Sequence, residues 1–341
     1  MSTGWAIVST GRHPDQKAAP AINAAQDTEL VAVFSREMGR AQAFAEKHGA
    51  RAVYDDFDAL LHDPAVDVVY LASPNFLHCE QTVKAAQAGK HVLCEKPMAL
   101  TVEECRFMME ACHGQNVRLG VGFHLRYHPA HQRLRDLVQD GVLGAIALVQ
   151  AQWGYGARGQ EKPGPRAPLS QWWEDPAMVG AGTWMGSGVH CVDLLRYVLG
   201  KEVIEVAAIT DATEAVPLEH LATVLLRFED GTLGTAIASR RLPDSRNDVV
   251  VYGSHGRCVV RDSLVTDLQG EFEVVSELEQ AQEWYAPPDP LAMYVRQVES
   301  FNEAVASGTE PAATGWDGLK VVAITEAVVE SARTGRRIRL P

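Results

Sequence analysis

Over its first ~120 residues the sequence alternates short apolar runs with helical patterns, and this alternation restricts the possible fold more than any other feature. Strands are expected at residues 5–9, 30–34, 51–53, 66–72, 91–94 and 118–121. Between them, helices are expected around residues 18–25 and at 37–48, 56–61, 76–88 and 101–114. The run 66–72 is almost wholly apolar, as a strand covered on both faces should be. The pattern predicts an α/β domain with a Rossmann-type parallel sheet, the plan of a nucleotide-binding domain.

After residue 121 the pattern changes. A helix is expected at 129–139, a strand at 146–155 and a helix at 188–200, which ends at a C-cap glycine. Six β-rich runs follow between residues 203 and 275, and helices are expected at 291–307 and 318–334. With 341 residues the chain is long enough for about two domains. We therefore predict a Rossmann domain at 1–123 and, at 124–341, an α+β domain built on a large, mostly antiparallel sheet.

The composition excludes several classes of partner. The net charge of −13 disfavours nucleic acid and anionic membranes, because both are polyanions. The six cysteines form no CxxC motif, so reduced core thiols are expected. The sequence shows no signal-peptide pattern and no apolar run of membrane-spanning length. A cytoplasmic enzyme acting on a small molecule is the expectation.

The expected phosphate-binding turn follows the first strand and covers Ser9, Thr10, Gly11, Arg12, His13 and Pro14. Only the middle glycine of a GxGxxG fingerprint is present, so a plain strand-to-helix turn is an equally weighted alternative. The second strand ends in Ser35 and Arg36, where sites that prefer NAD have an acid for the ribose hydroxyls. A hydroxyl and a guanidinium suit a 2′-phosphate instead, which favours NADP, with NAD possible.

A strand at 91–94 is followed at once by Glu95, Lys96 and Pro97. Ligands of open α/β sheets bind beyond the carboxyl ends of the strands, so Lys96 stands where chemistry usually occurs. Pro97 disfavours helical geometry at Lys96. An ordinary solvated lysine at a strand end is the alternative.

Four motifs together identify a family resemblance. They are Ser73-Pro74-Asn75 with His78, Glu95-Lys96-Pro97, Gly180-Ala181-Gly182, and the segment Gly188-Val189-His190-Cys191-Val192-Asp193. In combination they resemble the glucose-fructose oxidoreductase and inositol dehydrogenase family, Gfo/Idh/MocA, over nearly the whole chain. His124-Leu125-Arg126, Trp172 and residues 313–318 are similar to its 1,5-anhydrofructose reductase-like members.

The resemblance implies hydride transfer between a nicotinamide and a hydroxyl or carbonyl carbon of a sugar, cyclic polyol or related molecule. It implies a cis peptide before Pro97 and proton transfer by Lys96 and His190, while Asp193 shares a helix face with His190 and could orient it. The family usually has an aspartate where this chain has Gly186. A homodimer or homotetramer is expected. The expected cofactor contacts are Ser9, Gly11, Arg12, His13, Ser35, Arg36, Ser73, Pro74, Asn75, His78, Glu95, Lys96, Pro97, Arg126 and Trp172.

Substrate contacts are expected from His124 by resemblance, and from Arg158 or Arg166 in the long loop 154–169. That loop is rich in glycine and proline and is interpreted either as a lid or as a surface excursion. His124, His128 and His131 have metal-like spacing, but Pro129 interrupts a shared helix and no carboxylate or cysteine joins them, so no metal is expected. Two alternative functions remain open: a dihydrodiol dehydrogenase acting on a ring diol, and a non-catalytic nucleotide-binding sensor or partner protein.

Overall fold

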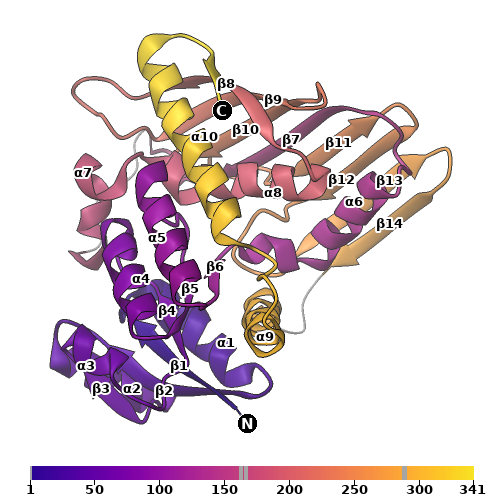
Figure 1. Cartoon of the computed structure of the whole chain (residues 1–341). Helices are drawn as coiled ribbons and strands as arrows, with labels where there is room; N and C mark the ends of the chain where they lie inside the picture. Colours follow the sequence, from indigo (N-terminus) through magenta and orange to yellow (C-terminus); the bar gives the residue numbers. More distant parts are fainter. Residues whose placement is uncertain (1, 161–163, 165–167, 286–289) are drawn as a thin grey trace. The chain divides into compact units, whose positions relative to one another are not determined.

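The computed structural model describes residues 2–160, 164, 168–285 and 290–341 (Figure 1). The chain divides into two compact units, Met1–His124 with Leu291–Lys320 and Leu125–Pro290 with Val321–Pro341. The division falls inside the last helix. The domain boundary at 123/124 stays a prediction.

The first unit contains a six-stranded sheet in the order β3-β2-β1-β4-β5-β6, and every strand pair is parallel. This confirms the predicted Rossmann sheet. Its strand order reverses between β1 and β4, the place where such sheets bind ligands. The strands are β1 (Thr3–Val8), β2 (Thr28–Phe34), β3 (Ala52–Tyr54), β4 (Val68–Leu71), β5 (His91–Cys94) and β6 (Leu119–Val121).

The helices of this unit largely follow the expected positions. They are α1 (Ala19–Ala24), α2 (Met38–His48), α3 (Phe57–Leu61), α4 (His78–Gln87), α5 (Val102–Gly114) and α9 (Ala292–Ser307). A capping box formed by Thr101 and Glu104 is present at the start of α5. The first helix begins with the π-helical segment η1 (Pro14–Ala18). Asn75 does not cap α4, because it begins the short 3-10 helix η2 (Asn75–Leu77), which precedes α4.

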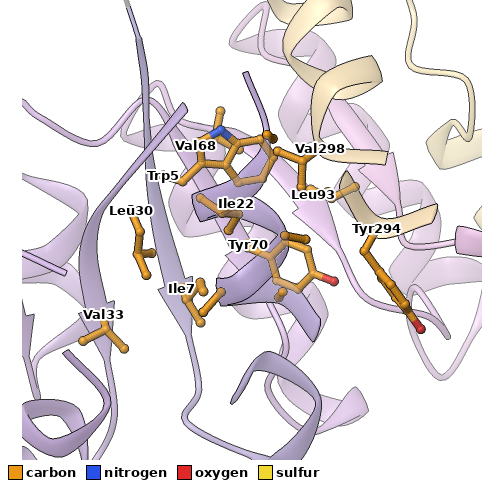
Figure 2. Packing of buried hydrophobic residues seen from close by; sticks show 14 of the residues in the cluster. Trp5, Ile7, Ile22, Leu30, Val33, Val68, Tyr70, Leu93, Tyr294 and Val298 are labelled. Carbon is orange, nitrogen blue, oxygen red and sulfur yellow. The ribbon is translucent and has the colours of Figure 1, made fainter. Parts of the chain in front are cut away.

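The core of the first unit lies between the sheet and a layer formed by α1, α2 and α9. Trp5 and Ile7 of β1 point into it with Tyr70 of β4 (Figure 2). From α9, Phe301 meets the Trp5 ring edge to face at 5.8 Å. Residues 291–320 thus complete a core whose other buried members lie between Trp5 and Leu93, a return of the chain that nothing in the sequence signals.

The second unit contains a nine-stranded sheet in the order β14-β13-β12-β11-β7-β10-β9-β8-β15. The sheet is mostly antiparallel, as predicted, with one parallel pair between β10 and β7. Helices α6 (Pro129–Gln139) and α8 (Val189–Leu199) pack on one of its faces. The strands are β7 (Ile146–Gly154), β8 (Val203–Thr210), β9 (Leu221–Phe228), β10 (Leu233–Ser239), β11 (Val249–Gly253), β12 (Gly256–Arg261), β13 (Gly270–Ser276), β14 (Gln280–Tyr285) and β15 (Ile338–Arg339).

The remaining elements complete both units. In the second unit they are η4 (Pro168–Glu174), α7 (Pro176–Val179) and η5 (Trp184–Gly188), and η3 (His124–Tyr127) and α10 (Gly315–Thr334) span the division. The turn Glu229-Asp230-Gly231 joins β9 to β10 as a hairpin, and Gly231 has φ 92°, which favours glycine. All six cysteines are thiols rather than members of disulfides, and five of them are buried. Within the described part of the chain, no helix is long and apolar enough to cross a membrane.

Candidate functional site

The turn predicted to bind the cofactor phosphates joins β1 to η1. Ser9 has φ 105° at the position of the first fingerprint glycine, a backbone conformation that L-residues rarely adopt. The Gly11 N–H donates to Ser9 Oγ at 3.3 Å. A Cβ added to Gly11 would meet only that oxygen within 4 Å, at 3.6 Å. The turn therefore keeps the backbone path of a glycine fingerprint and leaves the approach to Gly11 open, which fits a pyrophosphate.

Two arginines follow the carboxyl end of β2, and one of them, Arg40, contacts this turn. Ser35 is buried and Arg36 is exposed. From the first turn of α2, Arg40 Nη2 donates to Thr10 Oγ1 at 3.0 Å, and Arg40 also pairs with Glu37 at 3.5 Å. We did not predict Arg40 from the sequence, although a second arginine four residues after Arg36 is visible there.

The segment after β4 is fixed by a buried histidine. The ring nitrogens of His78 lie 2.9 Å from the carbonyl oxygens of Ser73 and Pro97, and the side chain is 1% exposed. Burial lowers the pKa of His78. Ser73 donates its hydroxyl to Gln81, and Asn75 is buried while Pro74 is partly exposed. His78 therefore connects the ends of β4 and β5, and the contact of this segment with a cofactor stays a prediction.

Lys96 lies at the carboxyl end of β5 and is half-buried. The Lys96–Pro97 peptide is cis, which confirms the prediction. Burial lowers the pKa of Lys96, and the neighbouring charge of Glu95 opposes that shift. A lowered pKa makes the neutral amine easier to reach, and an amine at a strand end is then better suited to proton exchange.

The Glu95 carboxylate makes contacts on both of its oxygens. Oε1 accepts the Tyr70 hydroxyl at 2.5 Å and lies 2.9 Å from His13 Nε2, while Oε2 accepts the Lys96 backbone N–H at 3.2 Å. Burial alone would raise the pKa of Glu95, but His13, Lys96 and Tyr70 together lower it to about 2. Glu95 is therefore an ionised carboxylate inside the first unit.

Tyr294 of α9 supports two of the predicted site histidines. His124 stacks on its ring at 4.8 Å, and His13 meets the ring edge to face at 5.7 Å. Lys17 Nζ lies 5.5 Å from the ring centroid. Tyr294 could not be expected here from the sequence, because α9 lies far from both histidines along the chain.

In the second unit, His190 lies on α8 and is 3% exposed. Its ring packs against Trp153 of β7 at 4.9 Å. Asp193, one turn further along α8, forms a buried bidentate ion pair with Arg126 at 3.0 and 2.6 Å. The structure thus joins two residues that were predicted for separate roles, a catalytic aspartate and a cofactor-binding arginine. Both roles stay predictions.

The start of this helical segment is held by a buried acid. Glu219 accepts the backbone N–H groups of Gly182 and Trp184, each at 2.8 Å. A Cβ on Gly182 would approach the Glu219 carbonyl oxygen to 2.1 Å, so only glycine fits there. A Cβ on Gly186 would have no atom within 4 Å, so the position that lacks the family aspartate has room for a side chain.

A pocket of about 260 Å³ opens in the second unit beside these residues. The Thr183 hydroxyl lines it, is buried and has no hydrogen-bond partner among the described residues. The pocket's other lining residues are Gly164, Trp173, Glu174, Gly182, Ala215, Val216, Pro217, Leu218, Glu219, His220 and Arg240. The lining offers an indole face together with hydrogen-bond donors and acceptors, a combination that suits a small polar ring.

The remaining predicted residues lie apart from this pocket or outside the described residues. Trp172 does not line the pocket itself, but its ring lies 4.6 Å from that of Trp173, tilted by 32°. Arg158 is exposed and pairs with Asp244 at 2.6 Å. Arg166 lies outside the described residues, so its predicted role is not addressed by the structure.

The two histidines that follow His124 have structural contacts. His128 caps α6 through the Ala130 N–H, and its Nε2 lies 2.8 Å from the Gln269 carbonyl oxygen. The His131 ring nitrogens lie 2.9 Å from the Leu125 carbonyl oxygen and from Ser263 Oγ. In the part of the chain that the structure describes, no group of three or more histidine, cysteine or acidic side chains could hold a metal ion.

The doubly wound sheet, the open turn at Gly11 and the lysine at the end of β5 define an NAD(P)-dependent oxidoreductase. Residues 3–123 match the family described as an oxidoreductase family with an NAD-binding Rossmann fold, and residues 131–259 match the GFO/IDH/MocA C-terminal domain. The chain belongs to the Gfo/Idh/MocA oxidoreductase family, which confirms the resemblance seen in the sequence.

Several relatives with assigned activities match over most of the chain. A 1,5-anhydro-D-fructose reductase of Ensifer adhaerens is 31% identical over 90% of both chains. A myo-inositol 2-dehydrogenase of Thermotoga maritima is 30% identical over 92% of both chains. Among solved structures, an aldose-aldose oxidoreductase from Caulobacter crescentus complexed with glycerol has a TM-score of 0.88, with 28% identity and complete coverage of both chains.

Proposed function

We propose that this enzyme uses NADP to transfer a hydride to or from a carbon that bears a carbonyl or hydroxyl group, on a sugar or cyclic polyol. The observation that carries the proposal is Lys96, a half-buried ammonium with a lowered pKa at the carboxyl end of β5. The relatives named above are reductases, dehydrogenases and oxidoreductases of such molecules. When bound, the cofactor supplies or accepts the hydride, and the protein orients the reactants and moves the proton.

The residues that would hold the cofactor come first from the β1 turn. Ser9, Gly11 and Arg12 would meet the pyrophosphate, supported by the open approach to Gly11. Arg36 would pair with the 2′-phosphate, and Arg40, which already contacts the turn through Thr10, would add a second guanidinium. The contacts expected by resemblance from Arg126 and Trp172 remain part of the proposal.

Lys96 and His190 are the proposed proton-transfer residues. A neutral amine on Lys96 would accept the hydroxyl proton during oxidation, and the ammonium would donate it during reduction. Burial lowers the pKa of Lys96, so the neutral amine forms at a lower pH than it does for a lysine in water. Asp193 would act by fixing α8 through its ion pair with Arg126, so that the His190 imidazole keeps one orientation.

The pocket of the second unit supports a hydroxylated substrate. Hydroxyl groups donate and accept hydrogen bonds, so they suit a lining that contains both Arg240 and Glu174. The indole of Trp173 can cover the apolar face of one sugar ring, and the volume of about 260 Å³ is small for anything larger.

The experiment that tests the proposal follows the nicotinamide absorbance with a panel of sugars, cyclic polyols and ring diols. We expect turnover with at least one sugar or polyol, and we expect Lys96→Ala and His190→Ala each to lower kcat by about 10²-fold or more. NADP affinity should stay within a few fold. The control variants Lys84→Ala and His62→Ala remove an exposed lysine and an exposed histidine and should keep parental turnover. Parental kcat in the Lys96 and His190 variants would refute their roles.

A ring diol is the second candidate substrate, and the room at Gly186 favours it. The family aspartate is absent there, so a substrate with its own polar group could occupy that space. Gly186→Asp should then raise activity toward sugar carbonyls and lower activity toward diols. An unchanged preference would remove this candidate.

A further inference from the structure

We propose that His13, Tyr70 and Gly122 are positioning residues for Lys96, and that they act through the carboxylate of Glu95. The inference rests on the proposed proton-transfer role of Lys96. The inference gives His13 a role other than contact with the cofactor, because His13 connects the nucleotide-binding turn to the lysine at the end of β5.

The contacts of Glu95 carry the first step. Its carboxylate accepts hydrogen bonds through both oxygens, so it has little freedom to rotate. His13 Nε2, at 2.9 Å, and the Tyr70 hydroxyl, at 2.5 Å, hold Oε1. Oε2 accepts the Lys96 backbone N–H at 3.2 Å. The orientation of the carboxylate therefore fixes the peptide that carries the Lys96 side chain.

Gly122 closes another side of the carboxylate. A Cβ at this position would lie 2.8 Å from Glu95 Oε1 and 3.1 Å from the carboxyl carbon. The Gly122 N–H donates to the Cys94 carbonyl oxygen at 2.8 Å, which holds Gly122 beside β5. Any larger residue would have to displace the carboxylate, so the absence of a side chain is what lets Glu95 take this orientation.

His13 and Tyr70 are themselves held in place. The His13 ring lies between Tyr70, with ring centroids 6.5 Å apart, and Tyr294, at 5.7 Å. The His13 side chain is 35% exposed, whereas Tyr70 is buried. His13 precedes η1 and so belongs to the predicted phosphate-binding turn. A change in the conformation of that turn would therefore shift the Glu95 carboxylate, and the carboxylate would in turn shift the backbone of Lys96.

The charge of Glu95 provides a second link between this carboxylate and Lys96. The low pKa of Glu95, about 2, keeps the carboxylate ionised at any working pH, even though its burial opposes this. The ionised carboxylate favours the ammonium form of Lys96 and so limits the fall in the lysine pKa that burial causes. Loss of the Glu95 charge should therefore lower the pKa of Lys96 further.

A purely structural role for this network would predict lower stability without any effect on Lys96. Two readouts in the full-length protein separate the possibilities. The first is kcat and KM with the best substrate. The second is the NMR signal of isotopically methylated Lys96 in the cofactor-free protein, assigned with Lys96→Arg, which reports the mobility and titration of the amine without any turnover.

We expect His13→Met and Tyr70→Phe each to lower kcat by about ten- to a hundredfold, because small displacements of a reacting group have effects of that size. KM and NADP affinity should change by less than a few fold. The Lys96 signal should report greater mobility. His13→Gln keeps a hydrogen-bond donor and should recover most of the activity lost in His13→Met. Gly122→Ala should reproduce the kcat loss without removing any functional group.

Glu95→Gln provides the electrostatic test. We expect the Lys96 titration to move to lower pH in the cofactor-free protein, which a structural role alone would not cause. Two control variants break comparable contacts elsewhere in the first unit. They are His48→Met, which removes the 2.8 Å pair with Asp15, and Tyr54→Phe, which removes the 2.9 Å bond to Asp63. Both should leave kcat and the Lys96 signal unchanged.

These experiments distinguish a failure of the inference about Lys96 positioning from a failure of the proposed function. Folded His13, Tyr70 and Gly122 variants with parental kcat and an unchanged Lys96 signal would overturn the inference while the oxidoreductase assignment stood. If the parental protein showed no turnover with any substrate, the proposed function would fail, and the NMR titration would still decide whether the network positions Lys96.

Discussion

Arg36 is the residue on which the proposed preference for NADP depends. It is exposed directly after β2, where a 2′-phosphate would lie if the cofactor follows the usual path of this fold. Arg36→Ala should weaken NADP binding by tenfold or more and leave NAD binding within about twofold, because only NADP has the phosphate that the guanidinium pairs with. Fluorescence titration with both cofactors measures this.

Arg51→Ala serves as the matched control for Arg36. Arg51 is an exposed arginine of the same unit that pairs with Glu29 at 3.1 Å, and its loss should affect neither cofactor. Equal weakening of NAD and NADP in Arg36→Ala would show that the arginine does not read the 2′-phosphate.

Glu95 makes the stability of the protein depend on pH in a predictable direction. Its pKa in the folded protein is about 2, against an ordinary value of 4.5. Because the folded-state value is the lower one, the ionised form contributes stability above pH 4.5, and that contribution is lost as the pH falls toward 2. A shift of this size corresponds to about 3 kcal/mol at neutral pH.

Urea unfolding of the parental protein and Glu95→Gln at several pH values tests this prediction. The difference between their free energies of unfolding should shrink by about 1–2 kcal/mol between pH 6 and pH 3. A difference that stays constant over that range would mean that the Glu95 pKa is not lowered by folding.

At the scale of elements, α9 contributes side chains to the core of the first unit, although it lies far from the strands of that unit along the chain. Phe301 is 2% exposed and packs against Trp5, and a Cβ on Gly120 would come within 2.8 Å of its ring. Phe301→Ala should lower the free energy of unfolding by about 3–5 kcal/mol, because it leaves a cavity in this core. Phe107→Ala on α5 is the control: that ring is 53% exposed, and the loss should be within about 0.5 kcal/mol. Similar losses for both variants would contradict the placement of α9.

The elements also show which features the sequence could predict. β5 and Lys96 were predictable because an apolar run followed by Glu95 and Pro97 is a local signal. β14 was missed because its residues are mostly exposed and polar, as is common in a strand at the edge of a sheet. The contacts of Tyr294 with His13 and His124 could not be predicted, since packing between distant segments leaves no local period. The family motifs identified Glu95, whereas the partners of its carboxylate came only from the coordinates.

At the scale of the whole molecule, the nine-stranded sheet has one face covered by α6 and α8 and large apolar side chains exposed on several strands. Ile209 is 80% exposed, Leu225 56% and Trp284 68%. Exposed apolar residues spread over one sheet often mark an interface, and we propose that a second copy of the chain covers them. Ile209→Glu with Leu225→Glu should shift the molecular mass in analytical ultracentrifugation from oligomer to monomer. A parental protein that is already monomeric at micromolar concentration would contradict this.

The most direct test of the central claim follows the hydride itself. Reduced NADP that carries deuterium at its transferable position is incubated with the carbonyl form of the best substrate from the panel, and the product is analysed by mass spectrometry and NMR. We predict one deuterium on the carbon that becomes the alcohol carbon, in the parental enzyme and, about 10²-fold more slowly, in Lys96→Ala. A product without deuterium at that carbon, or no conversion of any sugar or polyol carbonyl, would contradict the account.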